Sequence, residues 1–122
     1  MSTIKDKNLA TVGQQEVDWA ARQMKVLEEI KTEFSSSKPL NGLNIGACMH
    51  VTKETANLML TLKAAGANVA LCASNPLSNT DSVAAYLSEN DIEVHAVHGV
   101  SNEDFFKHLN SVLDTNPDIT MD

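Results

Sequence analysis

Apolar residues along the chain follow two spacings, one typical of helices and one typical of buried strands. Between residues 13 and 34 they recur every three or four positions and form one stripe, which includes Val17 and Ile30. This spacing predicts a single amphipathic helix over residues 13–34. The next stretch, 35–42, holds three serines, a proline and a glycine and predicts a loop.

Short apolar runs without polar alternation follow this loop, and segments with helical spacing separate them. Such runs are typical of strands that are covered on both faces. The predicted strands cover residues 43–50, 68–74, 92–99 and 117–122, and the predicted helices cover residues 53–66, 81–90 and 101–116. Thr52 and Ser101 stand at positions that favour helix capping, and Gly66 stands where a helix commonly ends.

Strands and helices that alternate with short connections predict an α/β fold. We expect a three-layer structure with a parallel sheet and helices on both faces, of the Rossmann-like or flavodoxin-like kind. Because the chain ends in a strand, we expect this sheet to be incomplete at the C-terminus and residues 1–122 to form part of a larger domain.

Composition limits the classes of function. The chain has 122 residues, with 9 basic and 16 acidic side chains, which gives a formal charge of −7. This length suits one domain, and the scattered basic residues argue against nucleic acid as a partner. No apolar run is long enough to cross a membrane, and the first residues lack the apolar centre of a signal peptide. Cys48 and Cys72 lie inside apolar runs, so we expect reduced thiols in the core of a cytoplasmic protein.

The candidate chemistry lies where the predicted strands end, because ligands bind beyond the carboxyl ends of strands in parallel sheets. His50, Thr52 and Glu54 come directly after the first strand and at the start of a helix. An imidazole can donate or accept a proton near neutral pH, and a carboxylate can accept hydrogen bonds from an amine or amide. Local roles stay open: Thr52 as a helix cap, and Glu54 as a first-turn carboxylate that favours the helix dipole.

The other polar residues at strand ends favour local roles. Ser78 and its neighbours after the second strand are typical of turns and helix caps. His95 is expected to pack within a strand, His98 has no carboxylate close to it in the sequence, and His108 is expected on the surface of a helix. No spacing of histidines and cysteines indicates a metal site, and the chain has neither a dinucleotide fingerprint nor a phosphate-binding loop.

Three stretches together resemble a known family. They are NLATVGQQEVDWAARQM, KPLNGLNIGACMHVTKETANLMLTLKAAGANV and ASNPLSNTDSVAAYL. In this order they are similar to the amino-terminal part of the substrate-binding domain of the adenosylhomocysteinases. The resemblance covers nearly the whole of this chain but well under half of a family chain.

The resemblance implies a reaction and roles for several residues. The family reversibly hydrolyses S-adenosyl-L-homocysteine to adenosine and L-homocysteine, in one-carbon metabolism, by NAD-dependent oxidation, elimination, addition of water and reduction. By position, His50 matches the catalytic acid–base, Thr52 and Glu54 match residues that hold the nucleoside, with Glu54 at the adenine edge, and Thr55 and Ser78 match supporting residues of the same pocket. The NAD-binding domain is absent from this chain, so the resemblance implies an inactive isolated chain and a homo-oligomeric full-length protein.

Two departures accompany the resemblance, and two other readings stay open. Asn79 and Thr80 stand where the family usually has threonine and glutamine, and Asp122 matches the first of two aspartates, of which the second belongs to the active site. The chain could instead be a stand-alone nucleoside-binding regulatory module without catalysis. A structural α/β protein of the two-component or flavodoxin-like type is the third reading, and it lacks the acidic strand end or phosphate loop that it would need.

Overall fold

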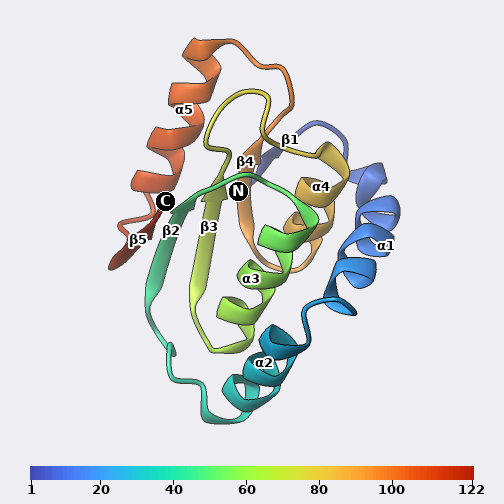
Figure 1. Ribbon diagram of the computed structural model, residues 1–122. Coiled ribbons are helices and arrows are strands. Elements are labelled where there is room, and N and C mark those ends of the chain that lie inside the picture. The colour runs from blue at the N-terminus through green and yellow to red at the C-terminus, as the bar shows by residue number, and fades with distance from the viewer.

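Five parallel strands in the order β1-β4-β3-β2-β5 form the centre of the fold (Figure 1). The computed structural model describes residues 1–122. The strands are β1 (Thr3–Ile4), β2 (Asn44–Cys48), β3 (Asn68–Cys72), β4 (Glu93–Ala96) and β5 (Ile119–Met121). The helices are α1 (Ala10–Ala21), α2 (Lys25–Ser37), α3 (Lys53–Ala64), α4 (Asp81–Glu89) and α5 (Asn102–Leu113), and a short 3-10 turn, η1 (Lys7–Leu9), precedes α1.

The helices cover the two faces of the sheet unequally. Helices α1 to α4 gather on one side and α5 lies alone on the other, as Figure 1 shows. The larger core cluster lies under α1, α3 and α4 and includes Leu71, Met59 and Val83. A smaller cluster of Ala70, Cys72 and Val112 lies under α5. The predicted three-layer α/β fold is therefore confirmed.

The elements expected from residue 43 onward are also confirmed, within a few residues at their ends. Thr52 and Ser101 cap α3 and α5, and their side chains accept from the backbone N–H groups of Thr55 and Asp104. Gly66 follows α3 with a positive φ of 100°, which a glycine adopts without strain. None of the helices combines the length and the apolar character that a membrane span requires.

The single helix expected over residues 13–34 is wrong, because two helices occupy this stretch. Gln23 N–H donates to Ala20 O at 2.9 Å and Met24 N–H donates to Ala21 O at 3.1 Å, which tightens the end of α1. Met24 itself leaves the helical region, with φ −113° and ψ 59°. The break lets α1 pack on α4 and α3, while α2 packs mainly on α3. The apolar stripe runs through the break, so its spacing gives no sign of the turn.

Two further expectations need correction. The sequence analysis assigned no element to the first residues, yet β1 pairs with β4 at the edge of the sheet, with Thr3 opposite His95. His108 was expected on the surface, yet it is only 8% exposed. It lies on the inner face of α5, with its ring centroid 6.3 Å from that of the buried His95.

Candidate functional site

The loops that follow β2 and β3 are tied together by main-chain hydrogen bonds. Val51 N–H donates to Ser78 O and Thr80 N–H donates to Val51 O, both at 2.9 Å. Thr52 N–H donates to His50 O at 2.9 Å, so the chain turns sharply just before α3. These bonds hold the carboxyl ends of the two central strands next to each other, where parallel sheets bind ligands.

The His50 ring and the hydroxyl groups of Ser74 and Ser78 form a hydrogen-bonded series at this edge. His50 Nδ1 lies 2.5 Å from Ser74 Oγ, and Ser74 Oγ lies 3.2 Å from Ser78 Oγ. Asn75 N–H donates to Ser78 Oγ at 3.2 Å, which fixes the second hydroxyl on the backbone. The His50 ring is exposed, and this arrangement uses one ring nitrogen and leaves Nε2 for a ligand.

Thr52 and Thr55 form a second pair at the start of α3. Thr52 Oγ1 accepts a hydrogen bond from Thr55 N–H at 3.4 Å and donates to Thr55 Oγ1 at the same distance. The capping role of Thr52 is therefore confirmed. Both side chains are half-buried, so a hydroxyl oxygen of Thr55 can still accept a hydrogen bond from a ligand.

Glu54 lies in the first turn of α3 and is exposed. Its only charged partner is Lys53, at 3.5 Å, and Lys53 Nζ also lies 5.6 Å from the centre of the Trp19 ring. Exposed ion pairs of this kind contribute little to stability. The carboxylate of Glu54 can therefore exchange Lys53 for an amine of a ligand at small cost.

The five residues expected at the site thus fall into separate groups. His50 and Ser78 are joined through Ser74, Thr52 is joined to Thr55, and Glu54 is joined to neither. The main cavities of the chain contain none of the five. The site is an open edge, and the joint contact of these side chains with one ligand stays a prediction.

Ser74 is the residue that the sequence analysis missed as part of the site. Strands β2 and β3 pair in register, so that Cys48 lies opposite Cys72. The same register, carried two residues further, places His50 opposite Ser74. The sequence alone could not identify this partner, because the register of the two strands is set by their pairing in the fold.

The third strand end is tied to the second by His98. Its N–H donates to Asp81 Oδ1 at 3.0 Å, and its Nδ1 lies 3.1 Å from Asn79 O. A carboxylate distant in the sequence is thus brought to His98 by the fold. Lys5 Nζ lies 3.7 Å from the other oxygen of Asp81. The Asp81 carboxylate therefore links the segment before α1 to the loop after β4, and both of its oxygens are engaged within the protein.

Asn79 and Thr80, the two residues that differ from the family pattern after β3, lie in different surroundings. Thr80 is exposed and precedes α4 without a capping bond from its side chain. Asn79 is only 7% exposed, and its side-chain oxygen and nitrogen have no hydrogen-bond partner. It pairs with the fully buried Val51 in a short parallel bridge. An unpaired buried amide costs about 1–3 kcal/mol of stability.

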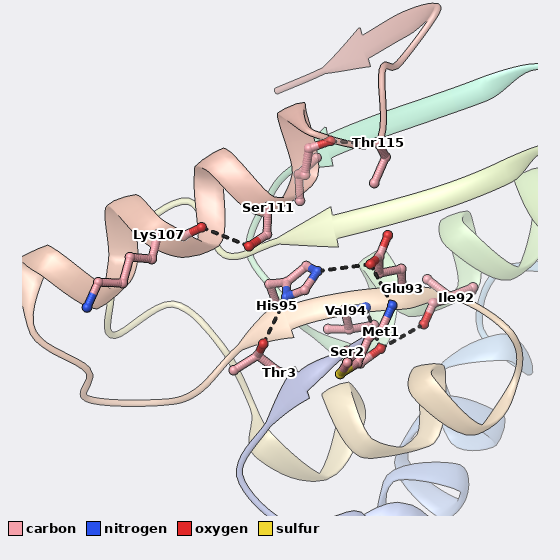
Figure 2. Close-up of polar contacts among 11 residues, drawn as sticks. Met1, Ser2, Thr3, Ile92, Glu93, Val94, His95, Lys107, Ser111 and Thr115 are labelled. Atoms are coloured by element: carbon pink, nitrogen blue, oxygen red, sulfur yellow. Dashed lines mark hydrogen bonds and ion pairs between the residues drawn. The ribbon is translucent and has the colours of Figure 1, made fainter.

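Another group of titratable residues lies at the β1 edge of the sheet, away from these strand ends (Figure 2). The N-terminal ammonium of Met1 lies 2.7 Å from Glu93 Oε1, and His95 Nε2 lies 3.4 Å from the same oxygen without hydrogen-bond geometry. His95 Nδ1 lies 3.0 Å from Thr3 Oγ1. These contacts fasten β1 to β4.

Burial shifts the pKa values of the titratable residues in this group. It lowers the pKa of His95, although the nearby carboxylate of Glu93 acts in the opposite direction. Burial and then the charge of His95 also lower the pKa of His108, against Asp104. For Glu93, burial favours the neutral acid, but the N-terminal ammonium and His95 outweigh it and hold the pKa below its usual value. Two buried histidines whose pKa values are lowered by burial suit packing rather than catalysis.

Comparison with known proteins gives consistent matches over the full chain. A family model described as S-adenosyl-L-homocysteine hydrolase matches residues 1–122. The adenosylhomocysteinase of Aquifex aeolicus is 49% identical over 120 residues, and that of Sulfolobus acidocaldarius is 46% identical over 119 residues. The S-inosyl-L-homocysteine hydrolase of Methanococcus maripaludis is 45% identical over 122 residues. These matches cover 98–100% of this chain but only 29% of the length of each relative.

Proposed function

This chain belongs to the S-adenosyl-L-homocysteine hydrolase family, and on that premise we propose that it forms one wall of a nucleoside site. The enzyme to which this wall contributes reversibly hydrolyses S-adenosyl-L-homocysteine to adenosine and L-homocysteine. The observation that carries the proposal is the His50 imidazole held by Ser74 at the carboxyl ends of β2 and β3. The start of α3 lies beside it and supplies further hydrogen-bonding groups.

His50 is the acid–base residue of this proposal. Elimination of homocysteine needs a proton at the departing sulfur, and addition of water needs a group that takes one away. An imidazole with Nδ1 engaged by a hydroxyl group can hold or release a proton at Nε2. Ser74 and Ser78 orient the ring through their linked hydroxyl groups.

The nucleoside is held at the start of α3. Thr55 and Ser78 offer hydroxyl groups, and the capping residue Thr52 sets the direction of the helix. Glu54 offers a carboxylate that accepts a hydrogen bond from the exocyclic amine of adenine. Hypoxanthine carries a carbonyl oxygen at that position, and two acceptors repel each other, so we propose adenosine rather than inosine as the preferred nucleoside.

The family reaction uses NAD, and the residues of this chain do not fit that cofactor. A dinucleotide needs a glycine-rich turn at a strand end so that the backbone can approach the pyrophosphate. The connection after β2 and the connection after β3 hold no glycine. The connection after β4 holds only Gly99. We therefore assign NAD binding to the remainder of a full-length enzyme and expect no hydrolysis by this chain alone.

Titration with adenosine, followed by ¹H–¹⁵N NMR of the 122-residue chain, tests the proposal. We expect weak binding, on the order of millimolar, with shifts at His50, Thr52 and Glu54, because one wall buries little of the ligand. Glu54→Gln replaces an acceptor by a group that can also donate, so it should weaken adenosine binding and strengthen inosine binding. Glu33→Gln, at an exposed position of α2, is the matched control.

The result of this titration distinguishes the proposed nucleoside wall from the alternative functions. Shifts confined to other parts of the chain, or no shifts at saturating nucleoside, would contradict the proposed wall. Micromolar binding would favour the stand-alone regulatory module, because a complete pocket would then lie within these residues. If the chain prefers inosine and Glu54→Gln leaves this preference unchanged, Glu54 does not contact the base.

A further inference from the structure

Cys48 and Cys72 face each other on neighbouring strands, two residues before His50 and Ser74 respectively. Cys48 ends β2 and Cys72 ends β3, and the two are register partners in neighbouring parallel strands. Residues opposite each other in a parallel pair project from the same face of the sheet, which here is the face under α5. Both thiols are free.

The spacing of the two strands suits a covalent bridge. Neighbouring strands lie about 4.8 Å apart, and disulfides join residues whose Cα atoms are roughly 4.4–6.8 Å apart. Each sulfur makes a long contact with a carbonyl oxygen across the pair: Cys48 Sγ with Ala73 O and Cys72 Sγ with Ala47 O, both at 3.7 Å. These long contacts hold the two thiols only weakly in their present orientations.

A cavity gives small molecules access to the pair. It has a volume of about 440 Å³, lies between α5 and the strands β2 and β5, and both cysteines line it. Cys48 is half-buried at its wall, whereas Cys72 is only 1% exposed. Apolar side chains, Phe106 and Leu109 among them, form the opposite wall. Cys48 is therefore the thiol that a molecule entering the cavity meets first.

We propose that Cys48 and Cys72 form a redox modification site, which a small disulfide such as oxidised glutathione converts into an intrachain disulfide. In the first step Cys48 loses its proton to solvent, and its sulfur attacks one sulfur of glutathione disulfide and releases one glutathione thiolate. In the second step Cys72 loses its proton, and its sulfur displaces the second glutathione from Cys48. Both released thiolates take up protons, so two protein thiols are oxidised and one glutathione disulfide is reduced to two glutathione molecules.

The ionisation of the two thiols agrees with this order. Burial raises the pKa of Cys72 to about 12, and the nearby Cys48 adds to the rise through its charge and a hydrogen bond. Cys72 is therefore a neutral thiol at neutral pH and a poor first nucleophile. Once Cys48 carries glutathione, it no longer bears a negative charge that opposes ionisation of Cys72.

A disulfide between Cys48 and Cys72 would affect the residues that follow it at the ends of β2 and β3. His50 follows Cys48 by two residues and Ser74 follows Cys72 by two residues. A covalent tie between the strands at this step changes their separation and twist, and the hydrogen bond between His50 and Ser74 spans the same two strands. The modification site does not rest on the proposed function, because its chemistry needs only the two thiols and the cavity.

Thiol counting and intact mass measure the reaction on the 122-residue chain. The folded protein is incubated with excess oxidised glutathione, trapped with N-ethylmaleimide and weighed. We expect loss of both reactive thiols and a decrease in mass of about 2 Da, which is two hydrogen atoms. Non-reducing electrophoresis should show a monomer, and ¹H–¹⁵N spectra should show shifts at His50 and Ser74.

Two variants make the test specific. Cys72→Ala keeps an apolar side chain at the buried position and should stop at a mixed disulfide between Cys48 and glutathione. Cys48→Ala should leave Cys72 unreactive until the chain is unfolded in urea. Circular dichroism shows whether each variant is folded. A wild-type chain that keeps both thiols, stays at the mixed disulfide or forms only disulfide-linked dimers would overturn the proposal.

Discussion

Helices α1 and α4 approach each other closely at Gly13, which lies in α1 against the start of α4. A Cβ atom placed at Gly13 would lie 2.0 Å from the carbonyl oxygen of Ser82 and 3.0 Å from Tyr86 Cβ. Ordinary contact with a Cβ begins at 3.4 Å, so α1 and α4 would have to separate by about 1.4 Å. The two nearest obstructing atoms, the carbonyl oxygen and carbon of Ser82, belong to the backbone and cannot rotate away.

Gly13→Ala therefore tests whether packing or helix propensity decides stability here. Alanine in place of glycine stabilises an unobstructed helix interior by about 1 kcal/mol. Overpacking of a rigid contact costs about 1–3 kcal/mol and sometimes more. Because the contact is with backbone, we expect the higher part of this range, a net loss of about 2 kcal/mol, and a fall in melting temperature of about 4 °C for each kcal/mol lost.

Urea unfolding followed by circular dichroism measures the free energy, and the fluorescence of the single tryptophan, Trp19, reports on α1 itself. Gln14→Ala, at an exposed position of the same helix, is the matched control and should change the free energy by less than about 0.5 kcal/mol. Ser82 follows closely after the loop that carries Ser78, so Gly13→Ala should also shift the ¹H–¹⁵N signals of that loop. A more stable Gly13→Ala chain would refute the packing argument.

Three further outcomes are expected. Asn79→Thr removes a buried amide without hydrogen-bond partners, and the free energy of unfolding in urea should rise by about 1–3 kcal/mol. Acidification from about pH 8 to pH 5 should lower the melting temperature: burial lowers the pKa values of His95 and His108, so below the ordinary value of 6.5 the unfolded chain binds more protons than the folded chain. Ser74→Ala removes the partner of His50 Nδ1, and long-range ¹H–¹⁵N NMR correlations should show a mixture of imidazole tautomers in place of one.

Each of these outcomes has its own contrary result. An unchanged free energy for Asn79→Thr would mean that the amide is solvated or paired in solution. For acidification, His108→Gln should reduce the loss of melting temperature between pH 7 and 5, and an equal loss would place the titration elsewhere. Ser74→Thr retains the hydroxyl group and should keep the tautomer of the original chain. The same mixture in both variants would show that the hydroxyl group does not orient His50.

Local spacing was sufficient for the elements from residue 43 onward. Each strand there is a short apolar run, and α3 and α5 begin at the capping residues Thr52 and Ser101, with Gly66 after the end of α3. These signals are local because the chain itself provides the hydrogen-bond partner or the backbone freedom. The site followed in part from the same logic, since parallel strands bring their carboxyl ends to one edge.

Long-range contacts decided the rest. The break at Met24 follows from the different packing partners of α1 and α2. The spacing of apolar residues does not indicate which element each part of the stripe packs against. The strand β1 exists because β4 offers an open edge, and its two residues have no pattern of their own. His108 is buried because α5 turns that face toward the sheet beside His95.

The sequence by itself determined the alternating α/β architecture, the caps of α3 and α5 and the residues that follow each central strand, because these depend on neighbours within a few positions. Only the tertiary structure decided that Ser74 holds His50, that Asp81 meets His98 and that Cys48 faces Cys72. Those contacts join residues 17 to 24 positions apart, and their formation depends on the strand register and the packing of whole elements.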